Sequence, residues 1–134
     1  MAHILVVDDE PEIVTLLRFV LEADGHTVGS AGHGLEALKT LGVEPLEPQI
    51  ALPDLIVLDI MMPVMDGYVL NQRLQTEART QGIPILVLTA KGQKMRDLFE
   101  MAPNVAAYVQ KPFDPKMLRE LISGILTSRK QTNG

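Results

Sequence analysis

The sequence contains no cysteine among its 134 residues, which excludes disulfides, thiolate nucleophiles and cysteine-based zinc sites. Basic residues are also scarce, because 12 Lys and Arg stand against 17 Asp and Glu, giving a net charge of −5. Direct binding to nucleic acid is not expected, since it requires a basic face. No apolar run approaches the roughly 18–20 residues of a membrane-spanning helix, so no membrane association is expected either.

The amino terminus passes directly from Met1-Ala2-His3 into a short apolar run, without the basic segment and long apolar stretch of a secretory signal. A cytoplasmic location is therefore expected. An apolar content of 46% with 22% charged residues is typical of an ordinary globular protein, and the length fits one domain. We expect this domain to cover residues 1–127, followed by a polar tail, 128–134, that is frayed or is a truncated linker.

Short apolar runs with the length of strands alternate with runs of helical spacing. This order predicts a parallel sheet with helices on both faces, with the weak second strand at an edge. The stretch Glu44–Pro53 contains three prolines, at positions 45, 48 and 53, and is therefore expected to be a surface loop. The predicted strands are Ile4–Val7, Thr27–Ala31, Leu55–Leu58, Ile85–Leu88 and Ala106–Val109, and the predicted helices cover about 13–21, 35–41, 68–80, 95–102 and 118–126.

Four of the five predicted strands end on polar groups. Asp8 and Asp9 follow the first strand, Asp59 ends the most hydrophobic one, Thr89 follows the fourth and Lys111 comes after the fifth. Parallel α/β sheets bind ligands outside the carboxyl ends of their strands, so these groups should meet in one crevice. Three acids suit a hard divalent cation, while a hydroxyl and an ammonium suit a phosphoryl group.

Each of these residues also has a purely structural explanation. Asp9 and Glu12 have the spacing of a helix capping box, and Pro11 suits a first helical turn. Asp59 could pair with a lysine, although an acid after such a hydrophobic strand is costly unless a cation compensates it. Adjacent acids repel each other and a cap needs only one of them, so a cation such as Mg²⁺ explains Asp8-Asp9 better. The three histidines lie on separate elements without ligand spacing.

Taken together, the motifs resemble the receiver domain of bacterial two-component response regulators. The resemblance covers about residues 3–126. No single short motif is specific for this family, but the matching segments taken together and in order are. It implies a flavodoxin-like fold, with five parallel strands in the order 2-1-3-4-5 and five helices. The matching segments, in order, are Val6-Val7-Asp8-Asp9-Glu10, Leu58-Asp59-Ile60-Met61-Met62-Pro63 with Asp66-Gly67, Leu88-Thr89-Ala90, and Tyr108-Val109-Gln110-Lys111-Pro112-Phe113.

The resemblance implies that Asp59 is the phosphoacceptor, taking a phosphoryl group from a histidine kinase. It also implies that Asp8, Asp9 and Asp59 bind Mg²⁺ with help from the backbone carbonyl of Met61. The cation and Lys111 would neutralise charge that spreads over the phosphoryl oxygens during transfer. The product would be an acyl phosphate.

The resemblance further assigns Thr89 and Lys111 to the phosphate oxygens after transfer. Tyr108 would be the aromatic that moves inward together with Thr89. Such a movement would alter the surface formed by the predicted helix Met95–Ala102, the following strand and the last helix.

Partners follow from the same resemblance. A sensor histidine kinase or a phosphotransfer protein would donate the phosphoryl group, and a downstream effector protein or domain would read the altered surface. A second copy of the chain, bound through the same surface, is a further candidate. A stand-alone receiver and a piece of a longer regulator or hybrid kinase both remain open.

Three rival classes are disfavoured by particular residues. A flavodoxin-like cofactor carrier would need a phosphate-cradling loop after the first strand, where this chain has Asp8-Asp9-Glu10-Pro11. A Mg²⁺-dependent phosphohydrolase would want a second acid two residues after Asp59, and Met61 stands there. A non-phosphorylated interaction module would not need the complete set of polar strand ends.

Overall fold

The computed structural model describes residues 2–60, 67–89 and 104–133. Its centre is a parallel five-stranded sheet in the order β2-β1-β3-β4-β5, which confirms the expected strand order. The predicted fourth helix, Met95–Ala102, lies outside the described residues. The strands are β1 (His3–Val7), β2 (Thr27–Ala31), β3 (Leu55–Asp59), β4 (Ile85–Thr89) and β5 (Val105–Gln110), and the described helices are α1 (Pro11–Ala23), α2 (Gly34–Thr40), α3 (Gly67–Gln75) and α5 (Pro115–Asn133).

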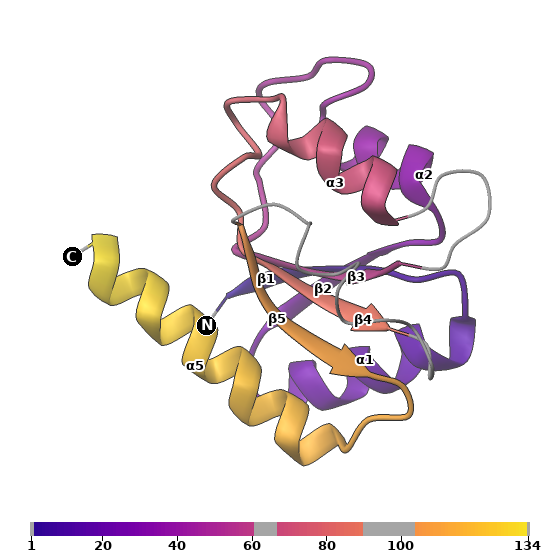
Figure 1. Ribbon diagram of the computed structural model, residues 1–134, viewed down its shortest axis with the longest axis vertical. Helices are drawn as coiled ribbons and strands as arrows, with labels where there is room; N and C mark the ends of the chain where they lie inside the picture. The colour runs from indigo at the N-terminus through magenta and orange to yellow at the C-terminus, as the bar shows by residue number, and fades with distance from the viewer. Residues whose placement is uncertain (1, 61–66, 90–103, 134) are drawn as a thin grey trace.

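Helices cover both faces of the sheet. Helices α2 and α3 lie on one face, and α1 and α5 lie on the other (Figure 1). Successive residues of a strand point to opposite faces, so each inner strand contributes to two cores. On β3, Ile56 and Leu58 join the cluster under α2 and α3, while Leu55 and Val57 join the cluster under α1 and α5.

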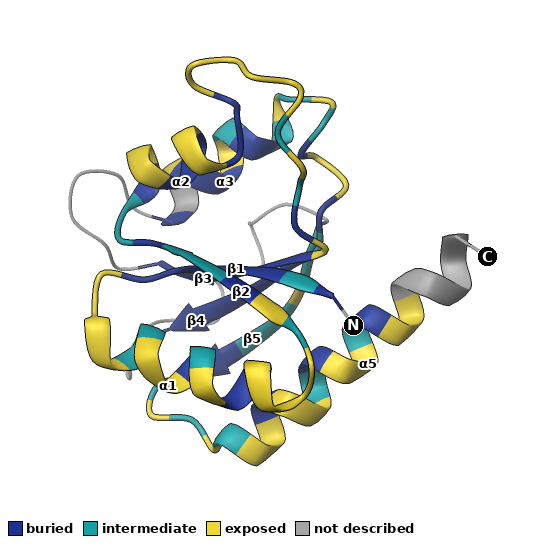
Figure 2. Cartoon of the chain, turned by 180° about the vertical axis from the view of Figure 1, so that it is seen from behind, coloured by how far each residue is buried: buried dark blue, intermediate teal, exposed yellow. Residues whose placement is uncertain are grey.

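Burial on two faces explains why the strands read as continuous apolar runs instead of alternating ones. Every residue of β3 and β4 is buried, including Asp59 and Thr89 at their ends. In Figure 2 the inner strands β3 and β4 are blue, whereas the edge strands β2 and β5 also carry teal and yellow residues. Most of the other yellow residues lie on the outer helix faces and in loops. The weak strand β2 lies at the sheet edge, as predicted.

Two predicted boundaries were wrong. Helix α3 ends at Gln75, five residues before the expected end at Thr80. The hydroxyl of Thr76 donates a hydrogen bond to the carbonyl of Arg73 at 2.8 Å. The hydroxyl of Thr80 donates one to the carbonyl of Leu74. Threonine hydroxyls that bond nearby carbonyls in this way offer the chain an alternative to the helix.

The second wrong boundary is at the carboxyl end. Helix α5 continues to Asn133, beyond the predicted helix end near residue 126, and so includes residues 128–133 of the stretch expected as a polar tail or truncated linker. The long helix extends past the sheet (Figure 1). Its start is fixed locally, because the carboxylate of Asp114 accepts a hydrogen bond from the backbone N–H of Lys116 at 3.0 Å.

The proline-rich stretch forms a surface loop, as predicted, and leads into the amino end of β3. Arg79 holds its base by donating to the carbonyls of Leu41, Gly42 and Ile50, the last at 2.9 Å. Gly42 has a φ of +71°, and a Cβ there would collide with the carbonyl of Glu47. The loop is therefore an ordered part of the fold, at the edge opposite the carboxyl ends of the strands.

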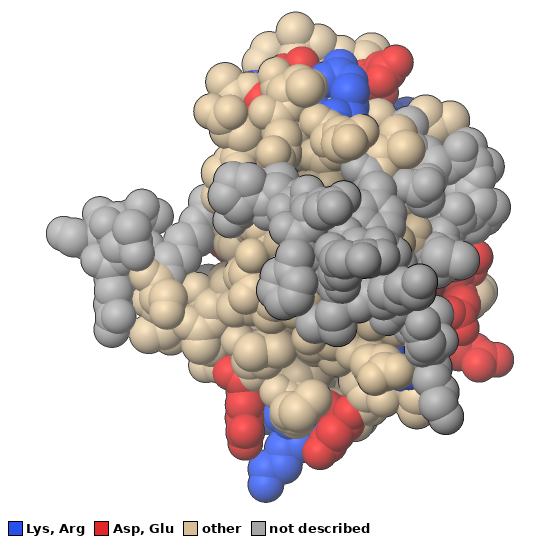
Figure 3. Space-filling view, in the orientation of Figure 1, with Lys and Arg blue, Asp and Glu red and all other residues tan. Residues whose placement is uncertain are grey.

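On the face shown in Figure 3, the described charged side chains carry both signs and lie at the top, along the right-hand side and at the bottom of the view. This distribution agrees with the net charge of −5. No helix among the described residues is long and apolar enough to cross a membrane.

Candidate functional site

The sheet register brings the polar strand ends to one edge. Asp8 follows β1 directly, Asp59 is the last residue of β3, and Thr89 is the last residue of β4. In neighbouring strands, Asp59 is level with Leu88, and Thr89 is level with Gln110, which precedes Lys111. The parallel pairing therefore places these groups side by side, as the sequence predicted.

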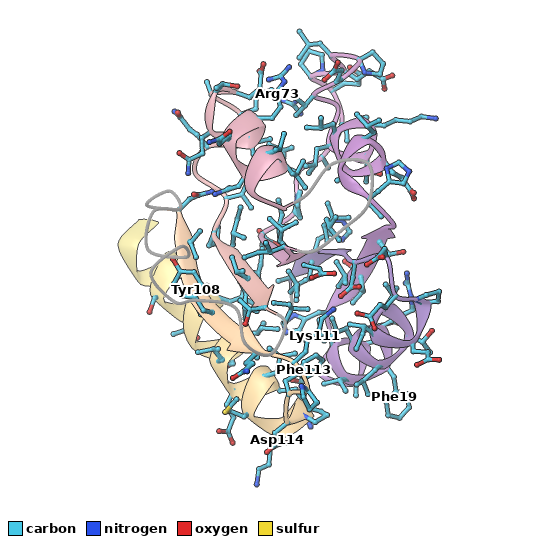
Figure 4. The ribbon with its side chains drawn as sticks, turned by 45° about the vertical axis from the view of Figure 1, so that its right-hand side comes forward. Phe19, Arg73, Tyr108, Lys111, Phe113 and Asp114 are labelled. Atoms are coloured by element: carbon cyan, nitrogen blue, oxygen red, sulfur yellow. The ribbon has the colours of Figure 1, made fainter. Side chains whose placement is uncertain are left out.

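Lys111 is the centre of this arrangement. Its Nζ lies 2.9 Å from Oδ2 of Asp8, 2.8 Å from Oε1 of Glu10 and 3.5 Å from Oδ2 of Asp59. Figure 4 shows Lys111 among the oxygen atoms at the ends of the strands. The backbone N–H of Lys111 donates to the carbonyl of Thr89 at 2.8 Å, which ties the residue after β5 to the end of β4.

Four carboxylates form a group with the composition of a cation site. One oxygen each of Asp8, Asp9, Glu10 and Asp59 lies within 4.8 Å of the others. Asp8 is 2% exposed and Asp59 is 3% exposed, whereas Asp9 and Glu10 are open to solvent. A hard cation prefers such oxygen ligands and keeps several waters, which the exposed side of the group would admit.

The buried oxygen of Asp8 is the clearest sign that a cation fits. Its Oδ2 is buried and lies 2.9 Å from the ammonium of Lys111, which is shared with Glu10 and Asp59. Burial raises the pKa of Asp8, and this effect outweighs the bond from the Glu10 N–H and the interaction with Lys111, which lower it. A buried carboxylate that shares one ammonium with two other acids gains from a bound cation. The donor set thus fits Mg²⁺.

Lys111 remains charged in this setting. Burial by itself would lower its pKa, but the bonds to Glu10 and Asp8 and the charges of Asp8 and Asp59 raise it on balance. The site therefore combines a permanent cation with buried carboxylates. The ammonium of Lys111 can neutralise charge on the oxygens of a phosphoryl group.

The capping-box alternative for Asp9 and Glu12 is wrong. The residue that precedes the first turn of α1 is Glu10, and its side chain makes no capping hydrogen bond. Instead, Oδ1 of Asp8 accepts from the backbone N–H of Glu10 at 2.9 Å. Asp9 is therefore not needed by the helix, which leaves its carboxylate for the site.

Gly67 fixes the chain beyond Asp59. Its N–H donates to the carbonyl of Ile60 at 2.8 Å. A Cβ at this position would lie 2.7 Å from Cα of Ile60 and 2.8 Å from the carbonyl oxygen of Asp59. Only glycine allows this close approach, and the glycine of the Asp66-Gly67 motif thus has a steric role.

Of the remaining predicted site residues, Thr89 is 6% exposed at the end of β4. Tyr108 lies on β5, partly buried, and packs against the apolar cluster under α2 and α3. Met61, whose carbonyl was predicted as a metal ligand, lies outside the described residues. Sequence reasoning missed Glu10 as a site residue, although its place directly after Asp8-Asp9 was a usable signal.

An open parallel sheet whose carboxyl edge carries a carboxylate group and a lysine defines an α/β protein of the flavodoxin-like class. The chain belongs to the response regulator receiver domain family, because the model of that family matches residues 4–123. Its function is accordingly that of a phosphorylation-dependent switch in two-component signal transduction.

Individual relatives agree with this assignment. The chain is 40% identical over 123 residues to the alkaline phosphatase synthesis transcriptional regulatory protein PhoP of Bacillus subtilis, covering 92% of this chain and 48% of PhoP. It is 36% identical to the DNA-binding dual master transcriptional regulator RpaA of Synechocystis, covering 94% of this chain and 49% of RpaA. The chain thus spans about half the length of these relatives, which are transcriptional regulators.

A solved structure supports the fold. The chemotaxis response regulator CheY4 of Vibrio cholerae superimposes with a TM-score of 0.80 at 28% identity. The match covers 93% of this chain and 98% of that one. This chain and the chemotaxis protein therefore share one architecture.

Proposed function

We propose that Asp59 is the phosphoacceptor of this receiver domain. The observation that carries the proposal is that Asp59, 3% exposed at the end of β3, faces the ammonium of Lys111 at 3.5 Å within a group of four carboxylates. A buried acid in such a group is costly to the fold, and phosphoryl chemistry gives a reason to keep it.

Asp8, Asp9 and Asp59, with the backbone carbonyl of Met61, are the residues that would hold Mg²⁺. When bound, Mg²⁺ would neutralise charge on the carboxylates and on a phosphoryl group. The buried carboxylate of Asp8, which shares one ammonium with Glu10 and Asp59, supports this set, and so does Asp9, whose carboxylate α1 does not use.

The chain's own residues account for the transfer step. A carboxylate oxygen of Asp59 attacks the phosphorus in line with the bond to the donor, and a new O–P bond forms. The P–N bond of a donor phosphohistidine breaks, and its electron pair stays on the imidazole nitrogen. Lys111 neutralises charge on the phosphoryl oxygens during this step, because its ammonium already stands at the carboxyl edge of the sheet.

The signal would leave the site through β4 and β5. New acceptor oxygens on Asp59 would draw the hydroxyl of Thr89, and Tyr108 would then move toward the space that Thr89 leaves. The surface that includes β5 and α5 would change as one packing replaces another. The differential interaction of Thr89 with the phosphoryl oxygens drives this population shift.

The proposed phosphodonor is a sensor histidine kinase or a phosphotransfer protein, and this partner implies a cytoplasmic location. An effector protein or domain, or a second copy of the chain, would read the altered surface. We expect no direct contact between this domain and nucleic acid, because its net charge is −5. In the regulators that it resembles, DNA binding would then belong to the part of the protein beyond the matched half.

Phosphate uptake from acetyl phosphate in the presence of Mg²⁺ tests the proposal. The parent should gain one base-labile, acid-stable phosphate, whereas Asp59→Asn should gain none and keep its fold. Asp114→Asn is the matched control, because Asp and Asn serve equally well at a helix start. Labelling of the Asp59→Asn protein at the parent's rate would rule out Asp59 as the acceptor.

A further inference from the structure

Glu10 makes the shortest contact to Lys111, although it is neither the proposed phosphoacceptor nor one of the proposed Mg²⁺ ligands. Its Oε1 lies 2.8 Å from Nζ of Lys111, closer than the oxygens of Asp8 and Asp59. The three carboxylates differ in burial, because the side chain of Glu10 is 56% exposed and those of the two aspartates are almost fully buried. Glu10 is therefore the carboxylate that contacts Lys111 from the side that faces solvent.

The backbone holds Glu10 in this place. Its N–H donates to Oδ1 of Asp8 at 2.9 Å, and Pro11 follows as the first residue of α1. Because the Glu10 side chain does not cap the helix, it can extend across to the residue after β5, 101 positions later in the chain. The contact thus links the start of α1 to the end of β5.

The charge balance shows what this contact does. Four carboxylates, those of Asp8, Asp9, Glu10 and Asp59, lie close together, and the ammonium of Lys111 pairs with three of them. Four negative charges and one positive charge leave the ionised group at −3 without a metal. An incoming phosphoryl donor is also an anion. It must take Lys111 away from the carboxylates that already hold it, and Glu10 is the one that stands on the side from which a donor can approach.

We propose that Glu10 is a positioning residue that restrains phosphorylation by holding Lys111 in the unphosphorylated state. It competes with the phosphoryl oxygens for the lysine ammonium, so its charge slows uptake. The two aspartates form the buried part of the same contact and also serve the metal and the nucleophile. Glu10 can therefore be changed without removing either of those functions. This inference rests on the proposed role of Asp59.

Glu10→Gln is the direct test, because glutamine keeps the length and an acceptor oxygen but removes the charge. Glu12→Gln is the matched control: Glu12 lies in the first turn of α1, is exposed, and loses the same charge near the site. Initial rates of phosphate uptake would be measured with acetyl phosphate and Mg²⁺. An exposed ion pair is weak, so we expect Glu10→Gln to be roughly two- to fivefold faster than the control.

Two further measurements separate the restraint from other roles. Titration with Mg²⁺ alone should give Glu10→Gln an affinity close to that of Glu12→Gln, because Glu10 holds the lysine and not the metal. The side-chain ammonium signal of Lys111 in ¹⁵N NMR should be sharp in the metal-free parent and control. It should broaden in Glu10→Ala, in which the contact is absent.

Equal uptake rates for Glu10→Gln and Glu12→Gln, or slower uptake by Glu10→Gln, would overturn the restraint. A clear loss of Mg²⁺ affinity in Glu10→Gln would make Glu10 a metal ligand and would also overturn it. If the parent took up no phosphate, the role of Asp59 would fall and this inference with it, whereas a labelled parent with indistinguishable variants would refute Glu10 alone.

Discussion

Replacing Gly67 with alanine tests how the chain after Asp59 is held. The new Cβ would lie 2.7 Å from Cα of Ile60, 2.8 Å from the carbonyl oxygen of Asp59 and 3.3 Å from the nitrogen of Ile60. All three are backbone atoms, so no side-chain rotation can relieve the contact. The chain that carries the phosphoacceptor must move, or α3 must move away from it.

The size of the effect follows from the crowding. Inserting a methyl group into a well-packed position costs about 1–3 kcal/mol. For a domain of this size roughly 4 °C of melting temperature corresponds to 1 kcal/mol, so the midpoint should fall by about 4–12 °C. Displacement of the Asp59 backbone by a fraction of an ångström to 1 Å should also slow phosphate uptake by roughly 10–100-fold.

Two glycines of the same chain are suitable controls. A Cβ at Gly82 or Gly124 would meet nothing within 4 Å. Gly124→Ala should stabilise α5 by about 0.5–1 kcal/mol, because alanine is the better helix former. Thermal unfolding by circular dichroism, together with uptake from acetyl phosphate, would compare the three variants. If Gly67→Ala had the same melting temperature as Gly82→Ala and took up phosphate as fast as the parent, a steric role of Gly67 would be excluded.

Two further variants test the charges at and away from the site. Asp9→Ala should weaken Mg²⁺ binding clearly in a titration, because it removes one of the four converging carboxylates, and an unchanged affinity would exclude Asp9 as a ligand. Arg119 bonds to Asp24 and lowers the pKa of that carboxyl below its usual 3.8, so the pair stabilises the fold at neutral pH and loses this contribution as the pH falls through the lowered pKa. Arg119→Gln should therefore be slightly less stable than the parent in denaturant at pH 7 and equal to it in strong acid, and a difference that persisted there would contradict the pairing.

Local information in the sequence determined most of the fold. Strands buried on both faces need continuous apolar runs, and the helices between them need apolar residues at helical spacing, so both patterns are visible without contacts between distant residues. The edge position of Thr27–Ala31 could be predicted for the same reason, because its small residues bury little surface. Since parallel strands share one carboxyl edge, the positions of Asp8, Asp59, Thr89 and Lys111 in the sequence also determined that they meet.

Local patterns were weaker at the ends of helices. The apolar spacing after Tyr68 continued toward Thr80, but hydrogen bonds from two threonine hydroxyls replace the last helical turn. The polar residues after Ser128 had no apolar face to predict a helix, yet they continue α5. Small energies decide such boundaries, and propensity alone does not resolve them.

The tertiary structure alone decided which partners the polar groups choose. Whether Asp9 caps α1 or is left for a cation depends on the hydrogen bond between Asp8 and Glu10, and this bond forms only when the chain turns at the end of β1. The contact between Glu10 and Lys111 joins residues 101 positions apart. Polar contacts over such separations depend on atomic distances of a few ångströms and on exclusion of water, and neither leaves a periodic pattern in the sequence.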